Sequence, residues 1–264
     1  MGIIKFQVDK LRAEIHANSE SCGPAAAKAA AEALFELGRK REVLSVVFAT
    51  GASQLNMLRA LVSHREIPWE KIQGFHLDEY VGLNVNHQAS FRKYLRENLI
   101  AFVRMRAFCE IDGNAQDLEG FCRDFGKKLR QSDPQLCLLG IGENGHLAFN
   151  EPSEADFHDP KDVKVVRLDV ACRRQQAAEG WFGTPEEVPD RAMTLTIPAI
   201  LRIPTLIVTV PGERKAHIVR RALQGPIAEE CPATILRTHP SAKLFLDSQS
   251  AAELDLSKTV VLAE

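Results

Sequence analysis

A short stretch near the middle of the chain, ENGHLAFNE at 143–151, brings together an amide, an imidazole and a carboxylate. A histidine close to a carboxylate can act as a general acid or base, because its charge changes between about pH 5 and 8. His146 and Glu151 are therefore candidate catalytic residues, and Asn144 lies just before the histidine. A purely structural role for His146 is the alternative interpretation.

The residues before this stretch indicate how it is positioned. Residues 136–139 (LCLL) form an unbroken apolar run that leads into Gly140 and Gly142, which predicts a buried strand followed by a turn. In open α/β sheets, ligands bind beyond the carboxyl ends of the strands, where loops converge on a rigid sheet. The glycines and the nearby carboxylate favour a built site over a structural histidine.

The same glycines raise the possibility of a dinucleotide site. Gly140, Gly142 and Gly145 match the G-x-G-x-x-G spacing, but that fingerprint requires a helix directly after the glycines. The residues that follow, HLAFNEPSEADFHDP, show no helical apolar period and contain Pro152 and Pro160. A dinucleotide site is therefore disfavoured.

A second group of polar residues follows another predicted strand. Asp78, Glu79 and Tyr80 come directly after the apolar segment 72–77. Two adjacent carboxylates are costly to bury, so such a pair is either solvated or functional. Its position at a strand end favours function.

A possible anion site follows the β-branched segment 43–49. The turn is formed by Thr50, Gly51, Ala52 and Ser53, and a periodic helix comes after it. Ser53 is a suitable N-cap residue for that helix. Free N–H groups and the positive end of a helix together attract an anion, although such turns are often only well capped. The sequence lacks the P-loop pattern.

A comparable arrangement occurs later in the chain. The buried strand predicted at 204–210 is broken by Pro211 and Gly212, and a helix start containing Lys215 follows. Cations at a strand end and a helix N-terminus can bind an anionic ligand. The alternative is a solvated basic face of the helix.

These groups belong to a chain in which strands and helices alternate. This order predicts an α/β fold with a mostly parallel sheet covered by helices on both faces, and residues 1–264 are expected to form a single domain. Residues 3–8 are expected to form an edge strand. Other expected strands are 43–49, 72–77, 136–139, 163–168, 204–210 and 242–246; expected helices are 23–38, 87–99 and 114–130, and 169–180 is expected to be a polar connector.

The composition narrows the class of protein. With a formal net charge of -2, nucleic acid and anionic membranes are not expected as main partners. No apolar run reaches the roughly 18 residues of a membrane span, and the N-terminus lacks a signal-peptide core. The six cysteines show no metal-binding spacing, so we expect reduced thiols in a cytoplasmic protein.

Three motifs then become recognisable together. FHLDEYVGL at 75–83, GIGENGHLAFNEP at 140–152 and VPGERKAH at 210–217 resemble the glucosamine-6-phosphate deaminase/isomerase family, which is related to the 6-phosphogluconolactonases. The resemblance implies a Rossmann-like fold of the deaminase, ribose-phosphate isomerase and CoA-transferase type. A lactonase would carry Glu-Arg instead of Glu79-Tyr80 and would lack the Phe-Asn-Glu-Pro that supplies Glu151, so the deaminase branch is favoured.

The resemblance also implies an activity, in which an amino-sugar 6-phosphate and water give fructose 6-phosphate and ammonia. Asp78 matches the proton-transfer base, His146 the acid/base that opens the sugar ring, and Glu151 the carboxylate that orients it. Asn144 stands where many members have Asp. No metal or organic cofactor is implied. The implied substrate- and phosphate-binding residues are Thr50, Gly51, Ala52, Ser53, Gly142 and Lys215, with Arg173 as the arginine that joins them.

Several alternatives stay open at this point. The substrate could be galactosamine 6-phosphate or another hexosamine phosphate, and the chain could isomerise without releasing ammonia. A lactonase-type hydrolase and a non-catalytic sugar-phosphate sensor are further alternatives. Homo-oligomers are common in the family, so a homo-oligomer is possible.

Overall fold

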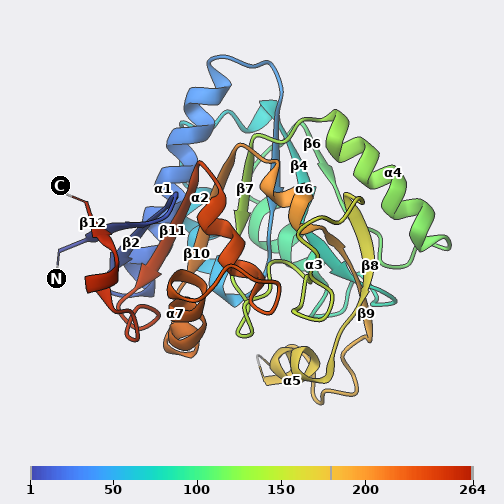
Figure 1. Cartoon of the computed structure of the whole chain (residues 1–264). Helices are drawn as coiled ribbons and strands as arrows, with labels where there is room; N and C mark the ends of the chain where they lie inside the picture. Colours follow the sequence, from blue (N-terminus) through green and yellow to red (C-terminus); the bar gives the residue numbers. More distant parts are fainter. Residues whose placement is uncertain (1, 179, 263–264) are drawn as a thin grey trace.

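The computed structural model describes residues 2–178 and 180–262, which build one large and one small β-sheet (Figure 1). The large sheet has nine strands in the order β12-β1-β2-β11-β10-β7-β3-β4-β6. All pairs are parallel except β1 with β2 and β1 with β12. Its strands are β1 (Ile4–Val8), β2 (Leu11–His16), β3 (Leu44–Phe48), β4 (Ile72–His76), β6 (Ala107–Cys109), β7 (Leu136–Leu139), β10 (Thr205–Val210), β11 (Ala242–Asp247) and β12 (Val260–Val261).

The centre of the large sheet consists of the apolar runs expected to be buried strands. β7 lies between β3 and β10, and every residue of β3 and β7 is buried. Unbroken apolar runs suit these positions because helices cover both faces of a parallel sheet. The three strands run in the same direction, so the loops after them meet at one edge of the sheet.

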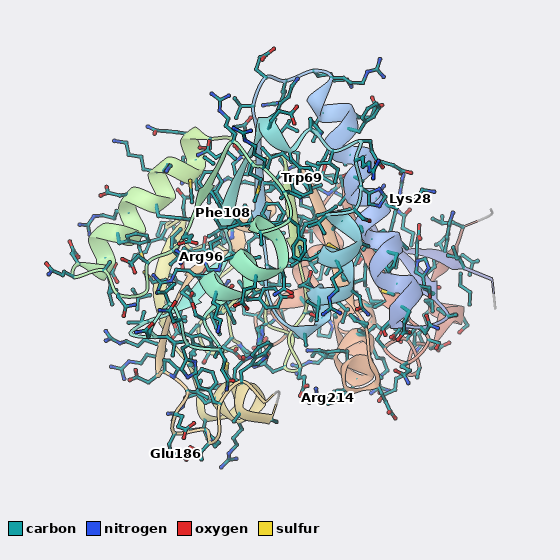
Figure 2. The ribbon with its side chains drawn as sticks, turned by 180° about the vertical axis from the view of Figure 1, so that it is seen from behind. Lys28, Trp69, Arg96, Phe108, Glu186 and Arg214 are labelled. Carbon is teal, nitrogen blue, oxygen red and sulfur yellow. The ribbon has the colours of Figure 1, made fainter. Side chains whose placement is uncertain are left out.

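Helices cover both faces of this sheet, as the sequence predicts. The apolar side chains of α1, α2 and α3 pack in one cluster, and those of α4, α6 and α7 pack in another. Figure 1 shows α6 and α7 over one face, and the reverse view shows α1, which carries Lys28, over the other (Figure 2). The helices are α1 (Ser19–Gly38), α2 (Leu55–Leu61), α3 (Phe91–Leu95), α4 (Leu118–Gln131), α5 (Val170–Ala178), α6 (Ile197–Leu201) and α7 (Ala216–Gln224).

The small sheet is antiparallel and was not anticipated. Its order is β5-β9-β8, formed by Asp78–Tyr80, Arg191–Leu195 and Val163–Arg167. The expected strand at 163–168 therefore exists but lies outside the parallel sheet. The expected polar connector after it is instead mostly helical, because α5 spans Val170–Ala178. This helix has a weak apolar period, which explains why the sequence pattern did not reveal it.

Other differences concern the ends of elements. β1 is not an edge strand, because the short β12 pairs with its outer side and β2 with its inner side. The helix expected at 87–99 begins at Phe91 with Ser90 as its N-cap, and a π-helical turn follows it. No helix among the described residues is long and apolar enough to cross a membrane.

Candidate active site

A cavity of about 370 Å³ opens where the loops after β3, β7 and β10 converge. This is the strand edge at which the sequence predicts a site. Its walls include residues from all four predicted groups, which lie far apart in the chain. The predicted site residues that line it are Thr50, Gly51, Ala52, Ser53, Asp78, Gly142, His146 and Lys215.

Two turns of similar geometry flank the turn after β7, because β3 and β10 lie on either side of β7. After β3, Gly51 has φ 103° and precedes a 3₁₀ turn (Ala52–Gln54) that leads into α2. After β10, Gly212 has φ 98° and precedes a 3₁₀ turn (Glu213–Lys215) that leads into α7. Positive φ angles favour glycine, so both glycines serve the turn. Each turn directs the start of a helix toward the cavity, as an anion site requires.

Each turn is fixed by a bond from another element. The Tyr94 hydroxyl, on α3, donates to the carbonyl oxygen of Gly51 at 2.9 Å. The N–H of Gly212 donates to the carboxylate of Asp247 at 3.0 and 3.1 Å, and Asp247 is itself buried. Ser53 does not cap α2, contrary to expectation, because the 3₁₀ turn makes Gln54 the N-cap residue. The anion-binding geometry is thus held by tertiary bonds.

Cations lie at the second turn. Lys215 and Arg214 both line the cavity. The Arg214 guanidinium lies 3.6 Å from the Glu143 carboxylate, which belongs to the turn after β7. Arg214 is labelled at the start of α7 in Figure 2. Its place in the cavity wall adds a second cation to the lysine that the sequence singled out.

Asp78 stands at the start of β5, where the chain passes from the large sheet to the small one. Its side chain lines the cavity although only 6% of the residue is exposed. Burial raises the pKa of Asp78 well above its usual value, and the adjacent Glu79 carboxylate raises it further. A carboxylate with a raised pKa at a cavity wall is suited to taking up a proton near neutral pH.

Glu79 has a different environment from its neighbour. It is completely buried and accepts hydrogen bonds from the backbone N–H groups of Phe91 and Arg92 at the start of α3. The Ser90 hydroxyl also donates to it, and the Arg92 guanidinium lies 3.4 Å away. Glu79 therefore anchors α3, and only one of the two adjacent carboxylates faces the cavity.

The turn after β7 builds the third part of the site. Gly142 lies beneath the imidazole of His146, since a Cβ at Gly142 would be 2.1 Å from its Nε2 atom. The histidine Nδ1 lies 2.8 Å from Oε1 of the fully buried Glu151. His146 therefore presents its other nitrogen toward the cavity. The glycine spacing serves this packing and not a dinucleotide.

Asn144 completes the group by holding the carboxylate. Its Nδ2 donates to Oε2 of Glu151, and its Oδ1 accepts the backbone N–H of His146 at 3.1 Å. Burial by itself would raise the pKa of Glu151, but the charge of His146 and the hydrogen bonds around the carboxylate outweigh it and lower the pKa to about 2. Glu151 thus stays ionised at neutral pH. Neither Asn144 nor Glu151 is part of the cavity wall.

Arg173 is the predicted site residue that the structure leaves outside. It lies on α5 but does not line the cavity, and its charge acts on the exposed Glu186. Glu186 is labelled beside α5 at the outer end of the molecule in Figure 2. Gln176, on the same helix, lines the cavity instead. Sequence reasoning missed Gln176 because α5 was taken for a connector, so no face of it was assigned.

The side chains present do not point to a metal centre. Within residues 2–178 and 180–262, no group of three or more His, Cys, Asp or Glu side chains is arranged to hold a metal ion. The acidic, imidazole and ammonium side chains of the cavity wall, Asp78, His146 and Lys215, are suited to proton transfer and anion binding.

Known proteins resemble this chain in sequence and fold. The chain is 32% identical over 206 residues to a glucosamine-6-phosphate deaminase of Streptococcus thermophilus, covering 78% of this chain and 86% of the relative. It is 32% identical over 224 residues to one of Bacillus cereus, covering 85% and 83%. A solved monomeric glucosamine-6-phosphate deaminase superposes with a TM-score of 0.82 at 28% identity, covering 93% of this chain and all (100%) of that one.

A 6-phosphogluconolactonase from Thermotoga maritima has a TM-score of 0.72 at 17% identity, covering 90% of this chain and 100% of that one, and shares the fold. Residues 17–245 match the family described as glucosamine-6-phosphate isomerases/6-phosphogluconolactonase. That match covers most of the chain and includes all three strand ends that meet at the cavity. The chain therefore belongs to the glucosamine-6-phosphate isomerase/6-phosphogluconolactonase family.

Proposed function

We propose that this protein is a glucosamine-6-phosphate deaminase, which converts glucosamine 6-phosphate and water to fructose 6-phosphate and ammonia. The observation that carries the proposal is a site with two carboxylates of opposite character, Asp78 in the cavity wall and Glu151 behind His146. The pKa of Asp78 is raised by burial, whereas that of Glu151 is lowered to about 2 beside His146. Groups whose pKa values are driven apart in one site are suited to separate proton-transfer roles.

The phosphate is bound at the convergence of the two glycine turns. Backbone N–H groups at Thr50, Gly51, Ala52 and Ser53 surround it on one side, and Lys215 supplies positive charge on the other. A phosphate at a helix N-terminus with a nearby ammonium gains both dipole and charge-assisted stabilisation. This end of the cavity fixes the substrate, so its reacting carbons extend toward Asp78 and His146.

Ring opening is the task of His146, which lines the cavity while Glu151 holds its Nδ1. The imidazole removes the proton from the anomeric hydroxyl and returns it to the ring oxygen as the C1–O5 bond breaks. The open-chain aldehyde results. Glu151 and Gly142 orient the ring of the histidine, and Asn144 keeps the carboxylate in place.

Asp78 carries out the isomerisation. It takes the proton from C2 while a water molecule gives a proton to the C1 carbonyl oxygen, and an enolamine forms. Asp78 then returns its proton to C1, which gives an iminium at C2. The hydroxide left by that water adds to C2, and its proton passes to the nitrogen as the C–N bond breaks and ammonia leaves. A desolvated carboxylate is the type of base that removal of a carbon-bound proton requires.

Two other activities on the same scaffold are kept as alternatives. A lactonase would hydrolyse an ester and needs no base above C2, whereas Asp78 faces the cavity with a raised pKa. A galactosamine 6-phosphate deaminase would use the same residues and differ only in contacts to the hydroxyl at C4. The deaminase names of the relatives favour the glucosamine substrate.

One assay separates these activities. The purified protein is incubated with glucosamine 6-phosphate, galactosamine 6-phosphate and 6-phosphogluconolactone, and ammonia, ketose phosphate and acid are measured separately. We expect equal amounts of ammonia and fructose 6-phosphate from the first substrate. Acid from the lactone without ammonia from either amino sugar would contradict the proposal. A ketose phosphate without ammonia would indicate an isomerase.

The cellular setting follows from the same proposal. The six cysteines, all within the described residues, form no disulfide. This fits a reducing compartment, and we place the enzyme in the cytoplasm. Its partner is a small phosphosugar.

A further inference from the structure

Helix α5 reaches the site at two points that lie one helical turn apart. At the first, the side chain of Cys172 hydrogen-bonds to the carboxylate of Glu151. At the second, the hydroxyl of Tyr80 donates to Oε1 of Gln176 at 2.7 Å. Residues four apart lie on one face of a helix. Figure 1 shows α5 at the end of the molecule where β8 and β9 emerge, so this face of α5 meets the site from outside the large sheet.

Tyr80 is a rigid support for Gln176. Its ring is fully buried and contacts three other aromatic rings, Phe91, Phe149 and Phe182, at centroid distances of 5.0, 5.1 and 5.5 Å. Aromatic contacts of this kind fix a ring in a single position. The Tyr80 hydroxyl, held in this way, fixes the side-chain amide of Gln176 to which it donates.

Gln176 lies at the Asp78 end of the cavity. Asp78 and Tyr80 are alternate residues of β5, so their side chains point to the same side of the strand. Gln176 bonds to Tyr80, lines the cavity and is only 8% exposed. Its bond to Tyr80 therefore holds Gln176 beside β5, the strand that begins with Asp78.

The bond from Tyr80 also determines what Gln176 offers to a ligand. Its Oε1 accepts the tyrosine hydroxyl, so the group left for the cavity is the Nε2 amide with its two N–H donors. Such donors match the oxygen atoms of sugar hydroxyls. They do not match an ammonium group, which needs acceptors.

We propose that Gln176 determines specificity by donating a hydrogen bond to a hydroxyl of the bound sugar, and that Tyr80 is the positioning residue that orients its amide. The inference rests on the proposed function, since it takes a hexose phosphate as the ligand. In this inference α5 contacts a hydroxyl of the sugar through the neutral Gln176. The contact expected from the sequence was between Arg173 and the phosphate. Gln176 thus acts on the sugar, whereas Lys215 acts on the phosphate.

The test compares two ligands that differ by the sugar. Dissociation constants for fructose 6-phosphate and for inorganic phosphate are measured by calorimetry in the wild type and in Gln176→Met. Loss of one buried hydrogen bond is expected to weaken fructose 6-phosphate binding about 5- to 10-fold. Phosphate binding should stay within about twofold of the wild type. The matched control is Arg174→Met, on the exposed side of the same helix, which should change neither constant.

A second variant tests the positioning role. Tyr80→Phe keeps the aromatic packing but removes the hydroxyl that holds Oε1. We expect a smaller weakening of fructose 6-phosphate binding than in Gln176→Met, again with phosphate unchanged, because the amide can rotate away. With glucosamine 6-phosphate as substrate, both variants should raise KM more than they lower kcat.

The outcomes distinguish this inference from the proposed function. If the wild type releases ammonia but Gln176→Met binds fructose 6-phosphate as tightly as the wild type, the inference is wrong and the function stands. An equal loss for sugar phosphate and inorganic phosphate would indicate a general disturbance of the cavity and would also overturn it. A wild type that binds phosphate but neither binds fructose 6-phosphate nor releases ammonia would contradict the function, and the inference with it.

Discussion

Two carboxylates belong to the same site, and their surroundings differ. Asp78 lines the cavity at the start of β5, where burial and the neighbouring Glu79 raise its pKa. Glu151 lies behind His146, bonded by Asn144, and its pKa is lowered to about 2. The difference indicates that one carboxylate exchanges protons and the other supplies a permanent negative charge.

The backbone explains why the two environments diverge. Asp78 leaves the large sheet beside another carboxylate, Glu79, which accepts hydrogen bonds from the start of α3. Glu151 lies at the end of a glycine-rich loop that folds back on itself through the bond from the N–H of Gly142 to the carbonyl of His146, at 3.0 Å. The folded-back loop brings donors to Glu151, whereas the donors beside β5 bind Glu79.

The largest predicted effect comes from removing the proton-exchanging carboxylate. Asp78→Asn should reduce kcat by roughly 10²-fold or more, because it abolishes proton transfer while leaving the shape of the site unchanged. Fructose 6-phosphate binding should stay close to that of the wild type. Asp124→Asn, an exposed aspartate on α4, is the matched control. If Asp78→Asn turned over at the wild-type rate, the assignment of roles to the two carboxylates would fail.

The pH dependence of the wild type tests the same assignment. A base must be deprotonated to work, so kcat/KM should fall as the pH drops through the raised pKa of Asp78. The acid limb should therefore lie well above 3.8, the usual value for aspartate. Glu151, with a pKa of about 2, should not contribute to this limb. An acid limb at or below the usual aspartate value would contradict the assignment.

A smaller loss of activity is expected from a change at the phosphate end of the cavity. This end positions the substrate for the groups that transfer protons. Lys215→Ala removes a charge-assisted contact worth about 1.5 to 3 kcal/mol, so kcat/KM should fall roughly 10- to 150-fold. Inorganic phosphate should compete with substrate in the wild type but much less in the variant. Lys28→Ala, on the far helix α1, controls for loss of a surface charge. Equal competition in both proteins would place the anion site elsewhere.

Sequence and structure agree best where burial dictates the pattern. The strand ends before Thr50, Gly140 and Pro211 could be located because a strand covered on both faces needs an unbroken apolar run. Most candidate residues on the loops after those strands line one cavity, and Asn144 and Glu151 lie behind its wall at His146. These positions depend on local sequence and on the common direction of parallel strands, both of which can be read from the chain.

The contacts that depend on distant pairing could not be predicted. Asp78 belongs to β5, which pairs with the distant strand β9 so that Asp78 lies opposite Thr194. The residues near Asp78 do not indicate this pairing. The family resemblance implies an arginine at the phosphate, which pointed to Arg173, but the face that α5 turns inward carries the contacts to Tyr80 and Glu151. The contact from the side-chain amide of Asn144 to Glu151, seven residues further on, likewise depends on how the loop folds back.

A modest change at Asn144 would make the two carboxylates more alike. Asn144→Asp replaces a donor to Glu151 with a second negative charge, which disfavours the ionised form and should raise the pKa of Glu151 by about one unit or more. The titration of Glu151 can be followed by carbon NMR of labelled glutamate. Asn86→Asp, on an exposed loop, is the control. A midpoint that stayed near 2 would show that the side chains do not interact as described.

The smallest predicted effect is a gain in the stability of Asp78→Asn, the variant that loses activity. Because ionised Asp78 is buried at a cost, Asp78→Asn should stabilise the fold at neutral pH by about 0.5 to 2 kcal/mol in urea unfolding. A raised folded-state pKa means that the cost is present above that pKa and disappears as the pH falls below about 3.8. The variant should then lose its advantage in acid. Destabilisation at neutral pH would contradict the raised pKa.

The central claim is that Asp78 moves the C2 proton while the group around His146 opens the ring. It is tested most directly by proton NMR of glucosamine 6-phosphate in deuterated water with each protein. We predict that the wild type removes the C2 proton and forms fructose 6-phosphate, whereas Asp78→Asn binds the substrate and leaves the C2 proton in place. Loss of the C2 proton in Asp78→Asn at a rate near that of the wild type would contradict the claim.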